Sequence, residues 1–403
     1  MMALTRNQID FQLKLQKQMD IDGFDALLLS SAESMFFASG FASRSVYNNG
    51  QVGNTLVVVP KDGKCTVICS QFESQSVALE CPDVNVVTYP IWLYIADFPD
   101  EGQKPTQPDP NKVMKLAVEV LSGFGHPIKK LGIENATLSY SKFEYLAGVY
   151  GRESLVDCNS LLIEARKFKT PWEIEVIREN SIMSERQMMM TAAAIDVGMT
   201  AAAIDVGMTE EDIMQYFSMY GYMQSKEVHG IRQAHTYSEY YSTAYIPRSH
   251  PLRNGDIVRL DGGVMRKGYI ADLGRTFVVG NKLDPECREI YDLMYDAYAL
   301  GLSMIGPGVK CADVFNAMMA LVQKKIPAFK RGHFGHSLSP LRGEDYPFIS
   351  NSNPGTFEPG MIFCIEAPYY SSKLGSYNVE DTLLITENSF ELFTHANKEL
   401  FWK

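Results

Sequence analysis

Two aspartates stand in the two halves of a stretch that predicts a β-hairpin, DIVRLDGGVMRKGYIADLGRTFVVG, residues 256–280. Apolar residues alternate with polar ones on both sides of a turn-like Arg-Lys-Gly sequence, as is typical of paired strands. If Arg266 and Lys267 form the centre of the turn, Asp261 directly faces Asp272. Like charges opposite each other on a sheet are destabilising, and a bound cation or a shared proton relieves them. The hairpin therefore predicts half of a metal site.

A second predicted hairpin, later in the chain, repeats the arrangement with two glutamates. Residues 361–386 read MIFCIEAPYYSSKLGSYNVEDTLLIT, and a turn centred on Lys373 places Glu366 opposite Glu380. Between the two hairpins, His336 lies in the segment GHFGHSL. Four carboxylates and one neutral imidazole are oxygen and nitrogen ligands that suit divalent Mn, Fe, Co or Zn. Because two such ions balance four negative charges, the sequence predicts a centre with two divalent metal ions.

These motifs resemble those of the pita-bread family, which includes creatinase, prolidase, aminopeptidase P and methionine aminopeptidase. Its metal-dependent members use Asp, Asp, His, Glu and Glu in that chain order, and LDGGVMRKGYIADLGRTF, GHFGHSL, FEPGMIFCIEAP and NVEDTLLIT are similar to its ligand segments. The resemblance implies an α+β fold, with a C-terminal catalytic pita-bread domain and a smaller N-terminal creatinase-like α/β domain. It also implies a homodimer and a metal-ligand set of Asp261, Asp272, His336, Glu366 and Glu380.

The length of 403 residues predicts two domains. We place an N-terminal α/β domain at residues 1–164 and the catalytic domain at residues 165–403. The first part alternates helical and strand patterns, with strands expected at Ala26–Leu29 and Asn85–Tyr89. The second part begins with TPWE, residues 170–173, in which Thr and Glu form a capping box around a proline at the first helical position. A long helix is therefore expected to start there.

Composition excludes several classes of protein. With 46% hydrophobic and 21% charged residues, the chain has the composition of a globular protein. Its net charge of -11 disfavours nucleic acid and anionic membranes as partners. No apolar run reaches the roughly 20 residues of a membrane helix, and the N-terminus lacks the apolar core of a signal peptide, so we expect a cytoplasmic protein. The seven cysteines are scattered, which predicts buried free thiols, Cys364 in the core among them.

The ligand set and the resemblance together predict a metal-dependent hydrolase of the Xaa-Pro peptidase type, acting on a small peptide or a small polar substrate. A water molecule that bridges two divalent ions has its pKa lowered towards about 7, so a metal-bridged hydroxide is the expected nucleophile. Glu366 is predicted to be both a metal ligand and the catalytic proton shuttle. His333 and His229 are predicted to contact the substrate.

Three positions depart from the peptidase pattern of the resembled family. Ala244 and Gly343 stand where the peptidases have histidines, and Asn378 stands where many have an arginine. Such outer groups stabilise the transition state, so we expect weak or absent cleavage of Xaa-Pro dipeptides. One alternative is therefore a family member that acts on a small non-peptide molecule, as a creatinase-like amidinohydrolase or a lyase of the dimethylsulfoniopropionate type. Another is a non-catalytic binding protein on the same fold.

Overall fold

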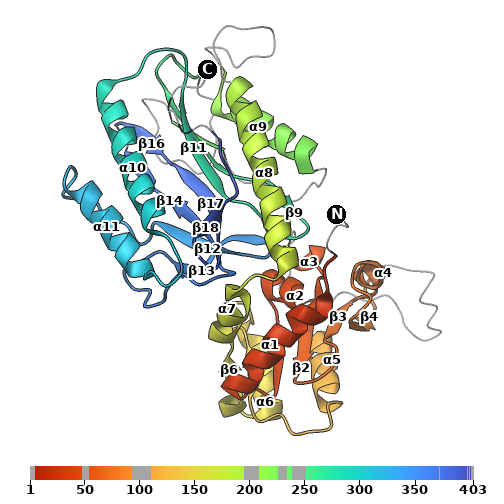
Figure 1. The fold of residues 1–403 in the computed structure, drawn as a ribbon. Coiled ribbons are helices and arrows are strands. Elements are labelled where there is room, and N and C mark those ends of the chain that lie inside the picture. Colours follow the sequence, from red (N-terminus) through yellow and green to blue (C-terminus); the bar gives the residue numbers. More distant parts are fainter. Residues whose placement is uncertain are drawn as a thin grey trace. The chain divides into compact units, whose positions relative to one another are not determined.

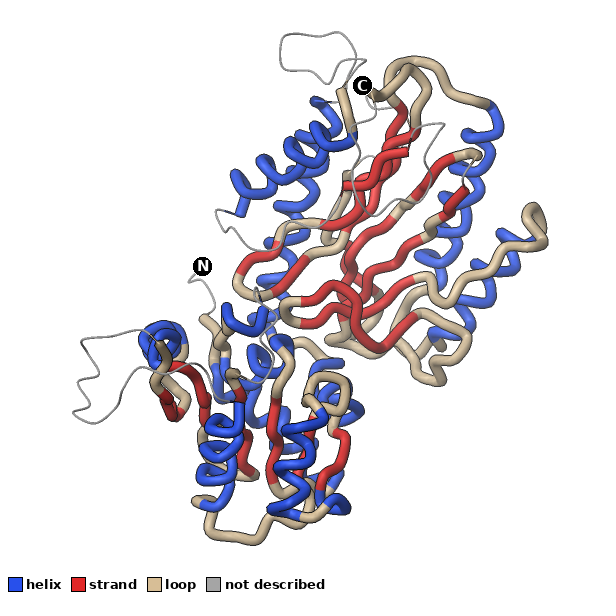
Figure 2. Tube along the Cα trace, turned by 180° about the vertical axis from the view of Figure 1, so that it is seen from behind, coloured by secondary structure: helices blue, strands red, loops and turns tan. Residues whose placement is uncertain are grey.

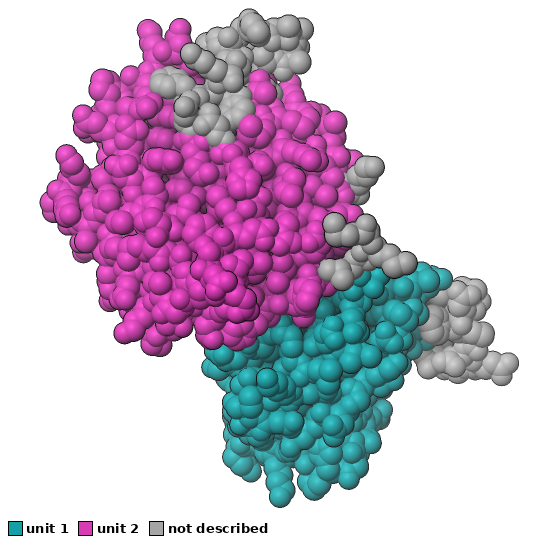
Figure 3. Space-filling view, viewed as in Figure 1, with its two compact units in different colours: residues 1–166 teal, residues 167–403 magenta. Residues whose placement is uncertain are grey.

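The chain divides into two compact units, Met1–Arg166 and Lys167–Lys403, which are coloured separately in Figure 3. The structure is a computed structural model, and it describes residues 5–47, 54–92, 110–194, 208–225, 234–237, 251–371, 373–396, 398 and 400. Among the helices described, none has the length and hydropathy needed to span a membrane.

The N-terminal unit is built on a six-stranded mixed sheet with the strand order β4-β3-β2-β1-β5-β6. Strands β1, β2 and β3 are buried at every residue, as is typical of strands that are covered on both faces. The predicted strands at residues 26–29 and 85–89 are confirmed as β1 and β4. The elements are α1 Gln8–Asp22, β1 Ala26–Leu29, α2 Ala32–Ser39, α3 Arg44–Tyr47, β2 Leu56–Pro60, β3 Thr66–Ser70, α4 Gln71–Glu80, β4 Asn85–Tyr89, α5 Pro110–Ser122, β5 Leu131–Ile133, α6 Tyr140–Tyr150, η1 Arg152–Ser154, β6 Leu155–Asp157 and α7 Asn159–Lys167.

The C-terminal unit is built on an eight-stranded sheet with the order β13-β12-β14-β17-β11-β8-β7, in which β18 also pairs with β17. Its strands lie between the α8–α9 pair and the α10–α11 pair in both Figure 1 and Figure 2. The elements are α8 Pro171–Ala194, α9 Glu210–Ser225, β7 Ala234–Tyr237, β8 Ile257–Gly262, β9 Met265–Arg266, β10 Tyr269–Ile270, β11 Leu273–Val278, α10 Pro285–Met304, α11 Cys311–Gln323, β12 Gly335–Ser339, β13 Arg342–Phe348, β14 Ile362–Glu366, β15 Tyr369–Ser371, β16 Gly375–Tyr377, β17 Glu380–Ile385 and β18 Phe390–Leu392.

The two faces of this sheet differ in chemistry because side chains alternate along each strand. Phe363 and Ile365 of β14 pack into the apolar core that also contains residues of α10 and α11. Leu260 of β8 packs into the core formed with α8 and α9. Asp261 and Glu366 alternate with these packing residues, and the direct pairings Asp261–Gly274, Gly274–Glu380 and Glu380–Glu366 place them on one common face, away from both cores. The alternation of side chains along each strand thus places the core residues on one face and the candidate site residues on the other.

Helix α8 fixes the position of the first hairpin. The predicted capping box is confirmed, since the Thr170 amide donates to Glu173 Oε2 at 2.7 Å and the Glu173 amide donates to Thr170 Oγ1 at 3.2 Å. The Asn180 side chain donates to the carbonyl oxygens of Arg266 and Tyr269, at 3.1 and 2.7 Å, on both sides of the hairpin turn. The fully buried amide of Asn180 thus anchors the turn to the helix.

Candidate metal centre

The turn of the first hairpin lies one residue later than the sequence predicted. Arg266 pairs with Tyr269, so the two turn residues are Lys267 and Gly268. Both have positive φ, 52° and 75°, as a two-residue type I′ turn requires, and the glycine adopts this conformation without strain. The prediction of Arg266 and Lys267 as the turn centre is therefore wrong, because it ignored the twist preference that favours a type I′ turn here.

The shifted turn changes the partner of Asp261, which pairs with Gly274 and not with Asp272. The observed register differs from the predicted one by two residues, and a shift of two keeps every side chain on its predicted face. Asp261 and Asp272 are therefore diagonal neighbours on one face. One carboxylate oxygen from each of them and one from Glu380 lie within 4.8 Å of one another, so the three carboxylates form one group.

The predicted register of the second hairpin is confirmed. Glu366 of β14 pairs with Glu380 of β17, and Tyr369 pairs with Tyr377 closer to the turn. Glu380 also pairs with Gly274 on the other side of β17, which brings the two hairpins together. A β-carbon at Gly274 would lie 2.5 Å from the Asn378 amide nitrogen and 3.0 Å from the Glu380 β-carbon, so this contact requires glycine.

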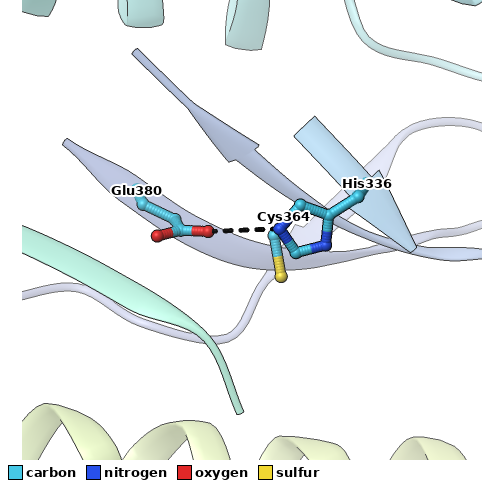
Figure 4. Close-up of side chains that lie close together, drawn as sticks. All are labelled: His336, Cys364 and Glu380. Carbon is cyan, nitrogen blue, oxygen red and sulfur yellow. Dashed lines mark ion pairs between the residues drawn. The ribbon is translucent and has the colours of Figure 1, made fainter. Parts of the chain in front are cut away.

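His336 on β12, separated from β17 by β14, approaches Glu380. Its Nδ1 lies 3.0 Å from the carbonyl oxygen of Ser337, which can only accept, so Nδ1 carries the proton and Nε2 presents its lone pair. Nε2 lies 3.8 Å from Glu380 Oε1 (Figure 4). The thiol of Cys364, on the strand paired with β12, forms a second group of possible ligand atoms with His336 and Glu380. Cys364 is buried as predicted, but its thiol lies with the candidate ligand atoms of His336 and Glu380.

The carboxylates repel one another strongly. Glu380 is 2% exposed, and burial together with the charges of Asp272, Asp261 and Glu366 raises its pKa well above the usual range of a glutamate. A divalent cation offsets both the burial of the charges and their repulsion. The oxygen-rich set with one imidazole has the donor chemistry of a Mn, Fe, Co or Zn site. The side chains present therefore fit a divalent metal ion.

Two arginines that the sequence prediction missed contact the carboxylates. Arg331 Nη2 lies 2.6 Å from Glu366 Oε1, and His333 Nδ1 lies 3.3 Å from the same oxygen. Burial raises the pKa of Glu366, but the positive charge of Arg331 and its hydrogen bond outweigh this effect, so the pKa lies below the usual range. Arg259 Nη1 lies 2.9 Å from Asp261 Oδ2 on the same strand.

Sequence patterns could reveal only one of these arginines. Arg259 precedes Asp261 by two residues in a strand, a spacing that places both side chains on one face. Arg331 lies just before β12, outside any strand, where no periodicity applies. Its position becomes clear only in the structure, in which the Glu366 amide donates to the carbonyl of Phe334, 3.0 Å away.

Asn378, one of the three departures from the peptidase pattern, contacts two of the predicted ligands. Its side-chain nitrogen lies 3.1 Å from Glu380 Oε2 and 3.4 Å from Asp261 Oδ2, and the residue is fully buried. An amide that donates to two carboxylates holds their orientation. Of the other positions singled out in the sequence, Gly343 is buried in β13. His229 and Ala244 lie outside the described residues.

Comparison with known proteins identifies the family. The profile of Metallopeptidase family M24 matches residues 186–387 of 403, and the profile of the Creatinase/Prolidase N-terminal domain matches residues 12–168. The chain belongs to metallopeptidase family M24. This membership confirms the predicted pita-bread fold and the predicted class, a metal-dependent hydrolase of the peptidase type, and it counts against a non-catalytic binding protein.

The chain is similar to a curated peptidase over most of its length and to two solved structures over nearly all of it. An uncharacterized peptidase of Bacillus subtilis, YqhT, is 28% identical over 298 residues, which are 72% of this chain and 78% of that protein. The prolidase of Pyrococcus horikoshii is 20% identical with a TM-score of 0.76 over 97% of this chain and 99% of its own. An Xaa-Pro dipeptidase of Bacillus anthracis is 19% identical, also with a TM-score of 0.76, over 98% and 99%. At these identities the solved structures establish the fold.

Proposed function

We propose that this M24 protein is a divalent-metal-dependent hydrolase that cleaves an amide or a related C–N bond in a small substrate, in the manner of an Xaa-Pro peptidase. The observation that carries the proposal is the group formed by Asp261, Asp272 and Glu380, which bring one carboxylate oxygen each to within 4.8 Å of one another at the junction of the two hairpins. His336 stands beside this group as a further candidate ligand, and Glu366 lies opposite Glu380 as the candidate proton acceptor.

A divalent ion bound to these residues supplies a Lewis acid and lowers the pKa of a water molecule towards neutrality. Glu366 accepts the proton, because Arg331 holds its carboxylate ionised. His333 is neutral at pH 7, since burial lowers its pKa, and a neutral imidazole can exchange a hydrogen bond with the substrate. Asn378 keeps Glu380 and Asp261 in place for the ion.

A small substrate that is not a peptide is the second candidate. Two observations favour it: Asn378 is turned towards the metal ligands, and Gly343 has no side chain with which to contact a scissile amide. Each lost oxyanion donor costs about 10²- to 10³-fold in rate. Xaa-Pro cleavage is therefore expected to be slow unless another group replaces them.

The experiment that tests both candidates is a panel assay of the Mn²⁺-loaded protein. Xaa-Pro dipeptides, longer Xaa-Pro peptides, creatine, and sulfonium or ring-amide osmolytes are offered side by side, with a Glu366→Gln variant as the inactive control. Rapid turnover of Xaa-Pro dipeptides establishes the peptidase and refutes the argument from the missing groups. Turnover of a non-peptide alone supports the second candidate. No turnover of any substrate, by protein that binds metal, contradicts the proposal.

We also propose a cytoplasmic homodimer. The described cysteines are all free and buried, which is typical of a reducing compartment. Large apolar side chains are exposed on two helices of the N-terminal unit, and a partner subunit would cover them: Ile9 and Leu13 on α1, at 49% and 56%, and Phe72 and Leu79 on α4, at 65% and 78%.

A further inference from the structure

Glu366 is held away from the other carboxylates. It belongs to neither group of described side chains that could share a metal ion, although it pairs directly with Glu380 in the sheet. Its Oε1 instead accepts from Arg331 Nη2 at 2.6 Å, with the Arg331 side chain 16% and the Glu366 side chain 9% exposed. A buried, charge-assisted contact of this length competes with a metal ion for the same oxygen.

The balance of charges at the centre also favours Arg331 over a second metal ion. The four carboxylates carry four negative charges, and the ion-paired guanidinium groups of Arg259 and Arg331 offset two of them. One divalent ion neutralises the remainder, whereas two ions would leave a buried excess of two positive charges. Glu344 also lies close enough to affect Glu380, but it is exposed and screened by water.

The two arginines have different effects on the ligands. Asp261 contacts Arg259 through Oδ2 and still belongs to the group with Asp272 and Glu380. Its contact with Arg259 is therefore compatible with metal binding. Glu366, in contrast, lies outside both groups while it contacts Arg331. Of these two arginines, only Arg331 keeps a carboxylate out of the second group, which otherwise contains His336, Cys364 and the shared Glu380.

We infer that Arg331 takes the place of the second divalent ion, so that the centre holds a single ion bound by Asp261, Asp272 and Glu380. This inference rests on the proposed function and departs from the two ions that the sequence predicts. Arg331 Nε is buried and has no hydrogen-bond partner, so an N–H donor remains for the substrate. A fixed guanidinium beside the ion stabilises developing negative charge, as a second metal ion does in two-metal sites.

The test counts metal ions and does not depend on activity. Full-length protein is stripped by chelation, loaded with excess Mn²⁺ and desalted, and its Mn²⁺ content is measured by elemental analysis together with its electron paramagnetic resonance spectrum. We expect one Mn²⁺ per wild-type chain, with the hyperfine-split spectrum of an isolated ion. Arg331→Met, which removes the charge at similar length, should bind two Mn²⁺ with the spectrum of an exchange-coupled pair. Arg331→Lys keeps the charge and should bind one.

Arg178→Met is the matched control, because Arg178 is also partly buried and ion-paired, with Glu391 at 2.9 Å, but does not contact the ligands. It should bind one Mn²⁺. Two ions in the wild type, or one ion in a folded Arg331→Met variant, would overturn the inference and leave the proposed function intact. If circular dichroism shows that Arg331→Met is unfolded, the number of Mn²⁺ ions per wild-type chain and the wild-type spectrum are sufficient to test the inference. Wild-type protein that binds no Mn²⁺ would overturn the proposed function as well.

Discussion

Replacing Glu380 by glutamine should stabilise the metal-free protein. The substitution removes a buried charge whose oxygen lies within 4.8 Å of those of Asp261 and Asp272. At an effective dielectric constant of about 20, one such pair repels by about 3.5 kcal/mol, and protonation of Glu380 relieves part of this. We therefore expect a gain of about 1 to 3 kcal/mol at pH 7, or about 2 to 12 °C in Tm for a unit of this size.

The gain should depend on pH in a defined direction. The folded-state pKa of Glu380 lies above its ordinary value of 4.5, so over this window the folded chain keeps a proton that the unfolded chain has lost. Metal-free wild type therefore loses stability as the pH rises from about 4.5 towards the folded-state pKa, by up to about 1.4 kcal/mol per pH unit. Glutamine does not titrate. The advantage of Glu380→Gln should be small below pH 4.5 and should grow above it.

Urea unfolding in chelator and in Mn²⁺ measures both effects. Mn²⁺ at about 100 times its Kd should stabilise the wild type by about 2.7 kcal/mol and Glu380→Gln by much less. Glu289→Gln, at an exposed position on α10, is the control and should change neither the pH dependence nor the response to Mn²⁺. A metal-free Glu380→Gln variant less stable than wild type at pH 7, or a Mn²⁺ response equal to that of wild type, would refute the electrostatic argument.

Four further outcomes are expected. Exhaustive chelation of wild type should lower its Tm and abolish hydrolysis; an unchanged Tm in calorimetry would contradict a metal site. Asp381→Asn should lower the free energy of unfolding by about 3 to 5 kcal/mol in urea titrations, because it leaves Arg275, 2% exposed and 2.7 Å from Asp381, without its counter-charge. Gly274→Ala should weaken Mn²⁺ binding about 10- to 100-fold in calorimetric titrations, since its methyl group displaces Asn378. Sedimentation at micromolar concentration should give a dimer, and a monomer would contradict the proposed assembly.

The two hairpins show how far sequence patterns determine the site. The register around Lys373 was predictable because the strands on both sides have equal lengths from the turn, and Glu366 faces Glu380 as expected. The register of the first hairpin was not predictable from alternation alone, since alternation is satisfied equally by registers that differ by two residues. The backbone preference of the Lys267-Gly268 turn decides between them. The face predicted for the two aspartates is still correct, because a register shift of two residues keeps each side chain on its face.

The groups around the ligands were harder to predict than the ligands. Arg331 reaches Glu366 from an irregular segment through a long side chain, and no sequence spacing encodes that direction. Cys364 looked like an ordinary core residue because its strand is buried on both faces. Asn378 was interpreted as the loss of an arginine, but its amide donates to Glu380. Short-range patterns place a residue on a face, whereas these contacts depend on the packing of several strands.

The candidate ligand group is assembled from strands that are distant in sequence, with Gly274 of β11 beside Glu380 of β17. Pairing of such strands requires the closure of a long loop and is a slow, late event in folding. A chain that has not yet joined the two hairpins offers no complete set of donors, so an ion has little affinity for it. Interactions absent from the folding transition state act on the unfolding rate. A bound ion should therefore prolong the lifetime of the native protein without hastening its formation.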